Sequence, residues 1–320
     1  MATRVACLAI LNYGGRALLH EALHSVTRQD FADYEVVVVD NGSADDSVAW
    51  LREHWPQVRV VALEHNVGVT AALNVMVRAA GDAEFVALLN NDVELDASWL
   101  AHLVETLRAH PRAAAAAGKL LRHSDRSVVD RVGDELQWSS ACFGRGAGQT
   151  DRGQFEDPGE VFSVGGAAAL YRAAALREVG PFDERFFAYL EDIDWGFRAR
   201  LAGWGARYDP RALGFHHGGA TLGEVSPFSM YHLRRNQVWL VVKNYPLASL
   251  VRHAPAIALF NAVQVAGALR SPLAKVVLRA YRDALGGLPR MLLARRAIQR
   301  GRRVRPRDLE QVVLRSGRPW

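Results

Sequence analysis

The stretch Glu35-Val36-Val37-Val38-Val39-Asp40-Asn41-Gly42-Ser43 decides the fold. An unbroken β-branched run that ends in a carboxylate and a glycine turn predicts a strand buried on both faces. Similar apolar runs alternate with helical patterns on either side of it. The predicted strands cover 5–11, 35–40, 58–63 and 84–90, and the predicted helices cover 16–28, 46–55, 69–80 and 97–110. This alternation predicts an α/β fold with a parallel sheet covered by helices on both faces.

The organisation changes twice further along the chain. Residues 122–160 are charged and glycine-rich, which predicts an irregular insertion, either a mobile loop or a short hairpin. Helical patterns return at 173–179 and 195–202, and an extended segment covers 206–215. We therefore expect an α/β domain over residues 1–225 and a helical, basic region over residues 226–320.

Charge is unevenly distributed along the 320 residues. Residues 231–320 hold 18 Lys and Arg against 3 Asp and Glu, a balance of +15, whereas residues 1–230 carry −10. A basic tail of this kind indicates a polyanionic partner, either nucleic acid or an anionic membrane surface. The tail lacks interleaved aromatic residues and any nucleic-acid motif, so we expect no nucleic-acid partner.

The tail contains an amphipathic pattern with two interpretations. An apolar stripe over 273–285 lies opposite Lys275, Arg279 and Arg282, and eight arginines follow between 290 and 307. The pattern is typical of a helix lying on a membrane surface, or of a helix packed on the catalytic domain with a solvated basic face. The apolar window 254–269 falls short of the ~20 residues that a spanning helix needs.

Cysteine content and the N-terminus indicate the compartment. Cys7 and Cys142 form no disulfide framework or metal-thiolate pattern, and the first apolar run is too short for a signal sequence. We therefore expect a protein of a reducing, cytoplasmic compartment.

Polar groups gather at the ends of predicted strands. Asp40 ends one strand and Asn90-Asn91-Asp92 ends another, so two polar sites converge on one rim of the sheet. Asp92 offers the hard oxygen that suits Mg²⁺ or Mn²⁺ bound with substrate phosphates. His216 or His217, after a later predicted strand, could complete the ligand shell. Taken singly, each residue also fits an ordinary turn or a structural histidine.

Glu191, Asp192 and Asp194 form a second acidic site within an aromatic stretch, 182–197. Carboxylates among bulky apolar groups are expensive to ionise and persist where a proton, a cation or a substrate hydroxyl uses them. We favour a catalytic base here; the alternative is an exposed helix start, where acidic residues favour the helix dipole. Together the sites predict a nucleotide-diphosphate donor, a divalent ion and a base acting in displacement at a sugar carbon.

The order of these motifs resembles the family-2 inverting glycosyltransferases, specifically the rhamnosyltransferase-like branch that builds bacterial surface polysaccharides. The resemblance spans roughly 4–245. It is carried by VVVVDNGSADDS (36–47), HNVG (65–68), LLNNDVEL (88–95), GGAAALYR (165–172), FDERFFAYLEDIDWGFRARLAGW (182–204) and HHGGAT (216–221). It implies a glycosyltransferase A-type fold, a mixed sheet flanked by helices, with a helical basic appendage at the C-terminus.

The resemblance implies a role for each donor-side residue. Asp40 would meet the nucleobase, and Asn66 and Asn91 would lie at the nucleotide. Asp92 would be the surviving carboxylate of the metal motif, with His216 as the metal-associated histidine. Asn90 stands where many relatives carry the first aspartate of that motif. An amide binds Mg²⁺ or Mn²⁺ more weakly than a carboxylate does, so the dependence on metal is left open.

On the acceptor side, the resemblance implies that Asp192 is the general base. Glu191 and Asp194 would support it or contact the acceptor. The acceptor side would be lined by Gly165, Gly166 and Arg198. The implied donor is a dTDP- or UDP-sugar, with dTDP-rhamnose favoured. The implied acceptor is a polyprenyl-linked saccharide, met by a peripheral enzyme on the inner face of the plasma membrane.

Two alternatives remain at this point. A sugar-1-phosphate nucleotidyltransferase would need a glycine-rich loop with a basic residue after the first strand, of which 12–16 is only a faint echo. A non-catalytic nucleotide-sugar-binding protein is disfavoured by the retained Asp92, Asp192 and His216.

Overall fold

The computed structural model describes residues 4–165, 167–218 and 226–316. Its strands are β1 (Ala6–Asn12), β2 (Tyr34–Asp40), β3 (Arg59–Ala62), β4 (Phe85–Asn90), β5 (Val93–Leu95), β6 (Ala113–Arg122), β7 (Val129–Arg131), β8 (Asp134–Leu136), β9 (Cys142–Gly144), β10 (Gly159–Glu160), β11 (Ala168–Arg172) and β12 (Gly205–His216). Its helices are α1 (Arg16–Val26), α2 (Ser47–His54), α3 (Val69–Ala79), α4 (Trp99–Ala109), α5 (Ala173–Val179), α6 (Glu191–Leu201), α7 (Pro227–Asn244), α8 (Leu247–Leu269), α9 (Ala274–Gly286), α10 (Leu288–Arg300) and α11 (Pro306–Ser316).

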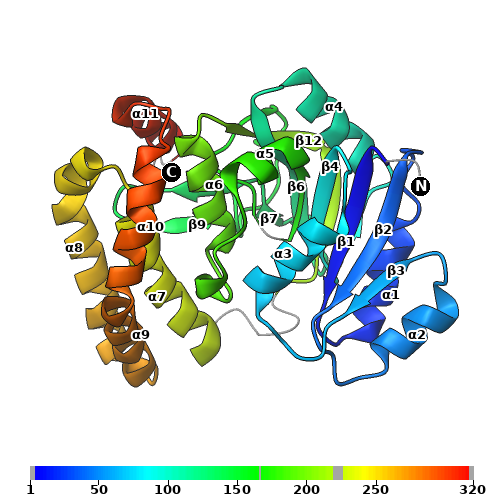
Figure 1. The fold of residues 1–320 in the computed structure, drawn as a ribbon, viewed down its shortest axis with the longest axis horizontal. Coiled ribbons are helices and arrows are strands. Elements are labelled where there is room, and N and C mark those ends of the chain that lie inside the picture. Colours follow the sequence, from blue (N-terminus) through cyan, green and yellow to red (C-terminus); the bar gives the residue numbers. More distant parts are fainter. Residues whose placement is uncertain (1–3, 166, 219–225, 317–320) are drawn as a thin grey trace.

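A mixed sheet with helices on both sides forms the centre of the molecule (Figure 1). Its strand order is β10-β12-β6-β11-β4-β1-β2-β3, with β5 paired to β12 and β7 paired to β6. Strands β1 to β4 are parallel, as their pattern predicts, but β11 runs antiparallel to both β4 and β6. The α/β class, the parallel pairing predicted for the first four strands and the mixed sheet implied by the resemblance are thus confirmed.

Strand β1 shows how the two faces of the sheet are filled. Cys7 and Ala9 point into a core shared with α3, α5 and α6, whereas Leu8 and Ile10 point into one shared with α1 and α4. All four side chains are fully buried. Burial on both faces explains the unbroken apolar runs, because no position along such a strand meets water.

Strand β6 is an element that the sequence pattern does not predict. It begins with five consecutive alanines, a composition typical of helices. The alanines are followed by Gly118, which lies opposite an irregularity of β12 between Asp209 and Leu213. A Cβ atom on Gly118 would lie 1.8 Å from the Ala212 carbonyl oxygen, so no larger residue fits there. Packing therefore overrides local propensity in this strand.

The insertion at 122–160 contains β7, which joins the main sheet, and the antiparallel hairpin β8–β9. The hairpin interpretation is thus confirmed. Cys142 lies on β9 and Cys7 on β1, and both thiols are free.

The C-terminal helices stand together beside the sheet, on the side away from β3 and α2 (Figure 1). The apolar stripe of α9 is buried there through Val277, Ala280 and Ala284, and α9 packs on α7. The packing interpretation is therefore confirmed for these three residues of the stripe, whereas Leu285 at its end is 62% exposed. No helix in the described part of the chain combines the length and the apolar character needed to cross a bilayer.

A buried ion-pair network fastens α7 to the sheet domain. Lys243 Nζ lies 2.8 Å from Asp194 Oδ2 and 2.6 Å from Asp183 Oδ2. Asn244 Nδ2 donates to the other oxygen of Asp194 over 2.8 Å. Lys243 and Asp194 are almost entirely removed from water, so each charge depends on its partners.

Replacing Lys243 with methionine should lower the free energy of unfolding by about 3 kcal/mol, because two buried carboxylates lose their shared cation. Urea unfolding followed by circular dichroism measures the change. Lys275→Met, at an exposed lysine on α9, is the control and should shift stability by less than about 0.5 kcal/mol. Equal stability of the two variants would contradict the prediction.

Candidate active site

Asn12 joins two predicted nucleotide residues at the carboxyl ends of β1, β2 and β4. Its Nδ2 donates to Asp40 Oδ2 over 2.7 Å, and its Oδ1 accepts from Asn91 Nδ2 over 2.8 Å. Asp40 also accepts from the Ser43 backbone N–H at 2.9 Å and the Ser43 hydroxyl at 2.6 Å. The structure therefore brings Asp40 and Asn91 together. With 1% of its surface exposed, Asp40 organises the turn that follows β2.

Asn66 belongs to a second loop that is locked against the same rim. Its Oδ1 accepts from Asn41 Nδ2 over 3.1 Å and from the Gly68 backbone N–H over 2.8 Å. Gly42 has a φ of +77°, and a Cβ atom there would lie 2.5 Å from the His65 carbonyl carbon. Glycine is thus required at 42 for the two loops to meet.

Asp92 and His216 face each other across the ends of β4 and β12. His216 Nε2 lies 3.3 Å from Asp92 Oδ1, a buried oxygen without a well-aligned hydrogen bond. On the other side of the ring, His216 Nδ1 lies 3.0 Å from Asp130 Oδ2. An orphaned carboxylate oxygen beside an imidazole nitrogen, with a carboxylate fixing the ring from behind, fits a divalent-cation site.

The charge around His216 also matches such a site. Burial opposes protonation of the ring, but the neighbouring Asp130 and Asp92 outweigh burial and raise the pKa of His216 to about 9. The two carboxylates thus attract positive charge to this position. His217 does not share it, because its Nε2 lies 3.1 Å from Glu21 Oε2 instead. The structure therefore separates the adjacent histidines, with His216 alone directed at Asp92.

The predicted base, Asp192, lies in the first turn of α6 beside Arg131, an arginine whose side chain is partly exposed. Asp192 Oδ2 is 3.8 Å from Arg131 Nη1, which also donates to Asp134 Oδ1 over 2.9 Å. Burial and the charge of Asp192 raise the pKa of Asp134 to about 6, although Arg131 opposes the rise. Gly165 makes room for this arrangement, because a Cβ atom there would lie 2.0 Å from Arg131 Nη1. Gly166 lies outside the described residues.

Glu191 precedes Asp192 and differs from it in environment. Its side chain is buried, and its Oε2 has no hydrogen-bond partner. Burial and the neighbouring Asp192 charge raise the pKa of Glu191 to about 8. Burial and the Asp192 charge thus favour the neutral form of Glu191, which limits the negative charge gathered at the start of α6.

Asp194 and Arg198 lie on another side of α6. Arg198 Nε donates to Asp194 Oδ2 over 3.0 Å, and the Arg198 guanidinium also donates to the carbonyls of Val179 and Pro181. Asp194 is fully buried against Lys243 of α7. The pairing of Arg198 with the acidic cluster occurs, but these contacts argue against acceptor binding by either residue. Both instead fix α6 in place.

Strand β7 connects the two halves of the site. Asp130 contacts His216, and the next residue, Arg131, contacts Asp192. Consecutive strand residues point to opposite sides, so β7 reaches His216 with one side chain and Asp192 with the next. Sequence reasoning missed Asp130, Arg131 and Asp134 because the insertion lacks a periodic pattern. The available signal was the clustering of charges over 130–135.

The sequence profile of glycosyl transferase family 2 matches residues 7–180. The chain belongs to this family. It is 30% identical over 241 residues to the N-acetylglucosaminyl-diphospho-decaprenol L-rhamnosyltransferase of Mycobacterium tuberculosis, a match covering 67% of this chain and 76% of that protein. It is 23% identical over 205 residues to the poly-beta-1,6-N-acetyl-D-glucosamine synthase of Staphylococcus epidermidis, covering 63% of this chain and 47% of that one.

Solved glycosyltransferases share the fold. The mannosyltransferase PcManGT of Pyrobaculum calidifontis, in complex with GDP-Man and Mn²⁺, superposes with a TM-score of 0.56 at 18% identity, covering 93% of this chain and 87% of that one. S. aureus TarS gives a TM-score of 0.61 at 18% identity, covering 96% of this chain and 50% of that one. The chain is thus a family 2 glycosyltransferase with the A-type fold, and its relatives point to sugar transfer in polysaccharide synthesis.

The buried carboxyl of Glu191 predicts a loss of stability as the pH rises. Its pKa is raised on folding, so its contribution is complete below its ordinary pKa and disappears as pH rises through about 8. The pKa of His216 is also raised, to about 9, so its contribution to stability is likewise lost as the pH rises through that value. Together these two groups should lower the free energy of unfolding progressively from about pH 4.5, where Glu191 begins to ionise in the unfolded chain, to about pH 9.

Urea unfolding at several pH values measures this fall. Glu191→Gln should reduce it, since the neutral amide never ionises. Glu53→Gln, at an exposed carboxylate of α2, should leave it unchanged. An identical pH dependence in wild type and Glu191→Gln would show that Glu191 is not the source.

Proposed function

We propose that the enzyme transfers a sugar with inversion from a nucleotide-diphosphate donor to a hydroxyl of a lipid-linked saccharide. The observation that carries the proposal is the β7 connection, which joins Asp92 and His216 to Asp192 through two consecutive side chains. Rhamnose is the favoured sugar, because the 30% identical relative is a rhamnosyltransferase named for a decaprenol-linked saccharide.

In this mechanism Asp192 is the general base. Its carboxylate takes the proton from the acceptor hydroxyl as that oxygen forms a bond to the anomeric carbon. The bond from this carbon to the diphosphate oxygen breaks on the opposite face, so the configuration inverts and the nucleotide diphosphate leaves with the electron pair. Arg131, 3.8 Å from Asp192, orients the carboxylate.

Asp92 and His216 would hold a divalent cation together with the donor phosphates. When bound, Mg²⁺ or Mn²⁺ would neutralise charge on the departing diphosphate. Asp130 would keep the His216 ring turned so that Nε2 faces Asp92, the role that carboxylates behind metal-bound histidines commonly have. The rim formed by Asn12, Asp40 and Asn91 would hold the nucleoside.

Asp192→Asn should preserve donor binding and lower turnover by a factor on the order of 10²–10⁴, because only the proton acceptor is lost. Donor binding is measured by calorimetry with dTDP- and UDP-sugars in Mn²⁺, and turnover by release of nucleoside diphosphate. Asp157→Asn, at an exposed loop position, is the control and should match wild type. A comparable loss of donor affinity in Asp192→Asn would reassign Asp192 to binding. Consumption of pyrophosphate instead of nucleoside-diphosphate release would favour the nucleotidyltransferase alternative.

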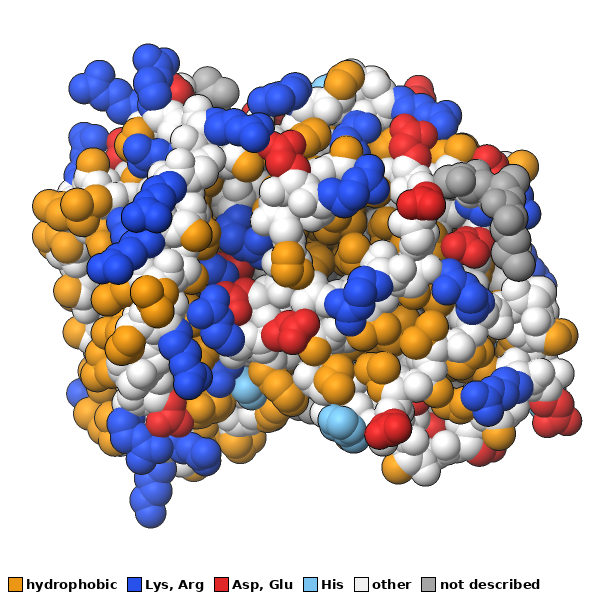
Figure 2. Space-filling view, viewed as in Figure 1, with side chains coloured by type: hydrophobic (Ala, Val, Ile, Leu, Met, Phe, Trp, Pro, Cys, Tyr) orange, Lys and Arg blue, Asp and Glu red, His pale blue; other side chains and the backbone are white. Residues whose placement is uncertain are grey.

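We further propose that the enzyme is peripheral on the cytoplasmic face of an anionic membrane. Helix α8 supports this with exposed apolar side chains, including Val251, Leu259 and Val263. Apolar side chains lie over α8 at the left edge of Figure 2, and Lys and Arg side chains gather along the neighbouring α9 and α10. The centre of the α9 stripe is buried, so α8 would supply most of the apolar contact and the arginines the electrostatic one.

The arginines available for lipid differ from the full cluster at 290–307. Arg295 donates to the carbonyls of Val242 and Tyr245, which makes it part of the α7–α10 packing. Arg290, Arg296 and Arg300 are exposed on α10. These three therefore form the appropriate set to neutralise, because their replacement leaves the packing intact.

Replacing Arg290, Arg296 and Arg300 with glutamine should weaken binding to vesicles rich in anionic lipid by on the order of 10²-fold, at about 1 kcal/mol for each charge. Co-sedimentation at low salt measures the binding. The control replaces Arg28, Arg52 and Arg78, three exposed arginines of the sheet domain, and should bind as wild type. Unchanged co-sedimentation of the α10 variant would refute membrane attachment through this surface.

A further inference from the structure

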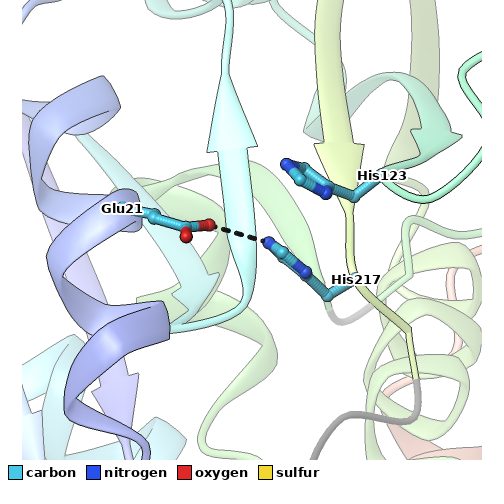
Figure 3. Close-up of side chains that lie close together, drawn as sticks. All are labelled: Glu21, His123 and His217. Carbon is cyan, nitrogen blue, oxygen red and sulfur yellow. Dashed lines mark hydrogen bonds and ion pairs between the residues drawn. The ribbon is translucent and has the colours of Figure 1, made fainter.

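Three side chains of types that can bind a metal ion, Glu21, His123 and His217, lie close together near the end of β12 (Figure 3). Glu21 comes from α1, His123 follows β6, and His217 follows β12. One ligand atom from each lies within 4.8 Å of the other two. His217 Nε2 lies 3.1 Å from Glu21 Oε2, and the rings of His123 and His217 stack with their centroids 3.8 Å apart.

The backbone beneath both histidines is fixed by hydrogen bonds. The His217 N–H donates to the Asp92 carbonyl over 3.0 Å, and the His123 N–H donates to the His216 carbonyl over 2.8 Å. Only side-chain rotation is therefore needed to turn the nearly parallel rings toward a common point. A backbone fixed in this way reduces the conformational entropy that the site loses when an ion binds.

The cluster remains open to solvent and to one more ligand. The exposed side-chain fraction is 22% for His217, 30% for His123 and 53% for Glu21. Glu94 Oε2 lies 3.4 Å from His123 Nε2, but Glu94 is also paired with Arg126 at 2.6 Å. A water molecule, or Glu94 after release from Arg126, could complete a four-coordinate shell.

We propose that Glu21, His123 and His217 bind Zn²⁺ at a site separate from the one formed by Asp92 and His216. Two imidazole nitrogens and a carboxylate oxygen are a ligand set that suits Zn²⁺ better than Mg²⁺, which prefers oxygen ligands. The bound ion ties α1 to the ends of β6 and β12. Since His216 directly precedes His217, the ion also holds the strand end that presents His216. The proposal stands without the transferase reaction.

The chain offers a competing site that serves as a control. His20 and His24 lie one turn apart on α1, with their Nε2 atoms 3.2 Å from each other. An exposed histidine pair of this kind also binds Zn²⁺, so a simple demonstration of zinc binding does not locate the site. Variants of both clusters are therefore compared.

The test uses the full-length protein after dialysis against EDTA, with no donor, Mg²⁺ or Mn²⁺ present. Zn²⁺ is titrated by calorimetry, and Co²⁺ serves as a visible-absorbing probe of four-coordinate geometry. We expect one tight equivalent of Zn²⁺, at least 10-fold weaker binding of that equivalent in both His123→Ala and His217→Ala, and loss of the Co²⁺ absorption in both. The His20→Ala/His24→Ala double variant should retain the tight equivalent.

Folding of the variants is checked by their unfolding midpoint in EDTA, which should equal that of wild type because these side chains are partly exposed. Glu21→Gln provides a second, milder test and should weaken Zn²⁺ while keeping the fold. Unchanged Zn²⁺ binding in His123→Ala and His217→Ala overturns the proposal, as does loss of binding only in the His20→Ala/His24→Ala variant. A wild-type dissociation constant weaker than about 0.1 mM also overturns it, because affinity in that range is ordinary for exposed histidines.

Discussion

The short strand β7 is the constraint on which the candidate site depends. Strand geometry sends the side chains of Asp130 and Arg131 in opposite directions. One reaches His216 at 3.0 Å and the other reaches Asp192 at 3.8 Å. A cation site and a base could each form on its own loop, but their separation is fixed because a single rigid peptide unit lies between them. Loss of pairing between β7 and β6 would uncouple the two.

Small residues allow β7 and β12 to take up these positions. Gly165 lets Arg131 pass close to the backbone, and Gly118 lets β12 approach β6. Strand β12 carries His216 at one end and pairs with β6 along most of its length. The positions of both site halves thus depend on residues without chemistry of their own, because close backbone approach requires the absence of a side chain.

The charged C-terminal region shows how packing divides one sequence signal into two roles. Arg295 and Lys243 are basic residues that hold helices together, through backbone carbonyls and through buried carboxylates. Arg290, Arg296 and Arg300 remain on the surface beside the apolar face of α8. Net charge alone does not separate these groups, because burial decides which charges a partner can reach.

Strand and helix order in the first half of the chain follow from the sequence, because unbroken valine runs and helical periodicity are local properties. The placement of Asp40 and Asn91 on one rim followed from the rule that parallel strands end on the same edge. The strand at Ala113–Ala117 did not follow from the sequence, because alanine favours a helix. Pairing with β12 holds this segment extended.

The partners of the carboxylates were also decided by tertiary structure. Within one turn of α6, Asp192 faces Arg131 while Asp194 faces Lys243, at residues 61 and 49 positions away along the chain. The sequence by itself determined which chemical groups were present and that three carboxylates shared a helix start. Only the fold decided which of them meets the site and which holds α7, because direction around a helix has meaning only once its neighbours are in place.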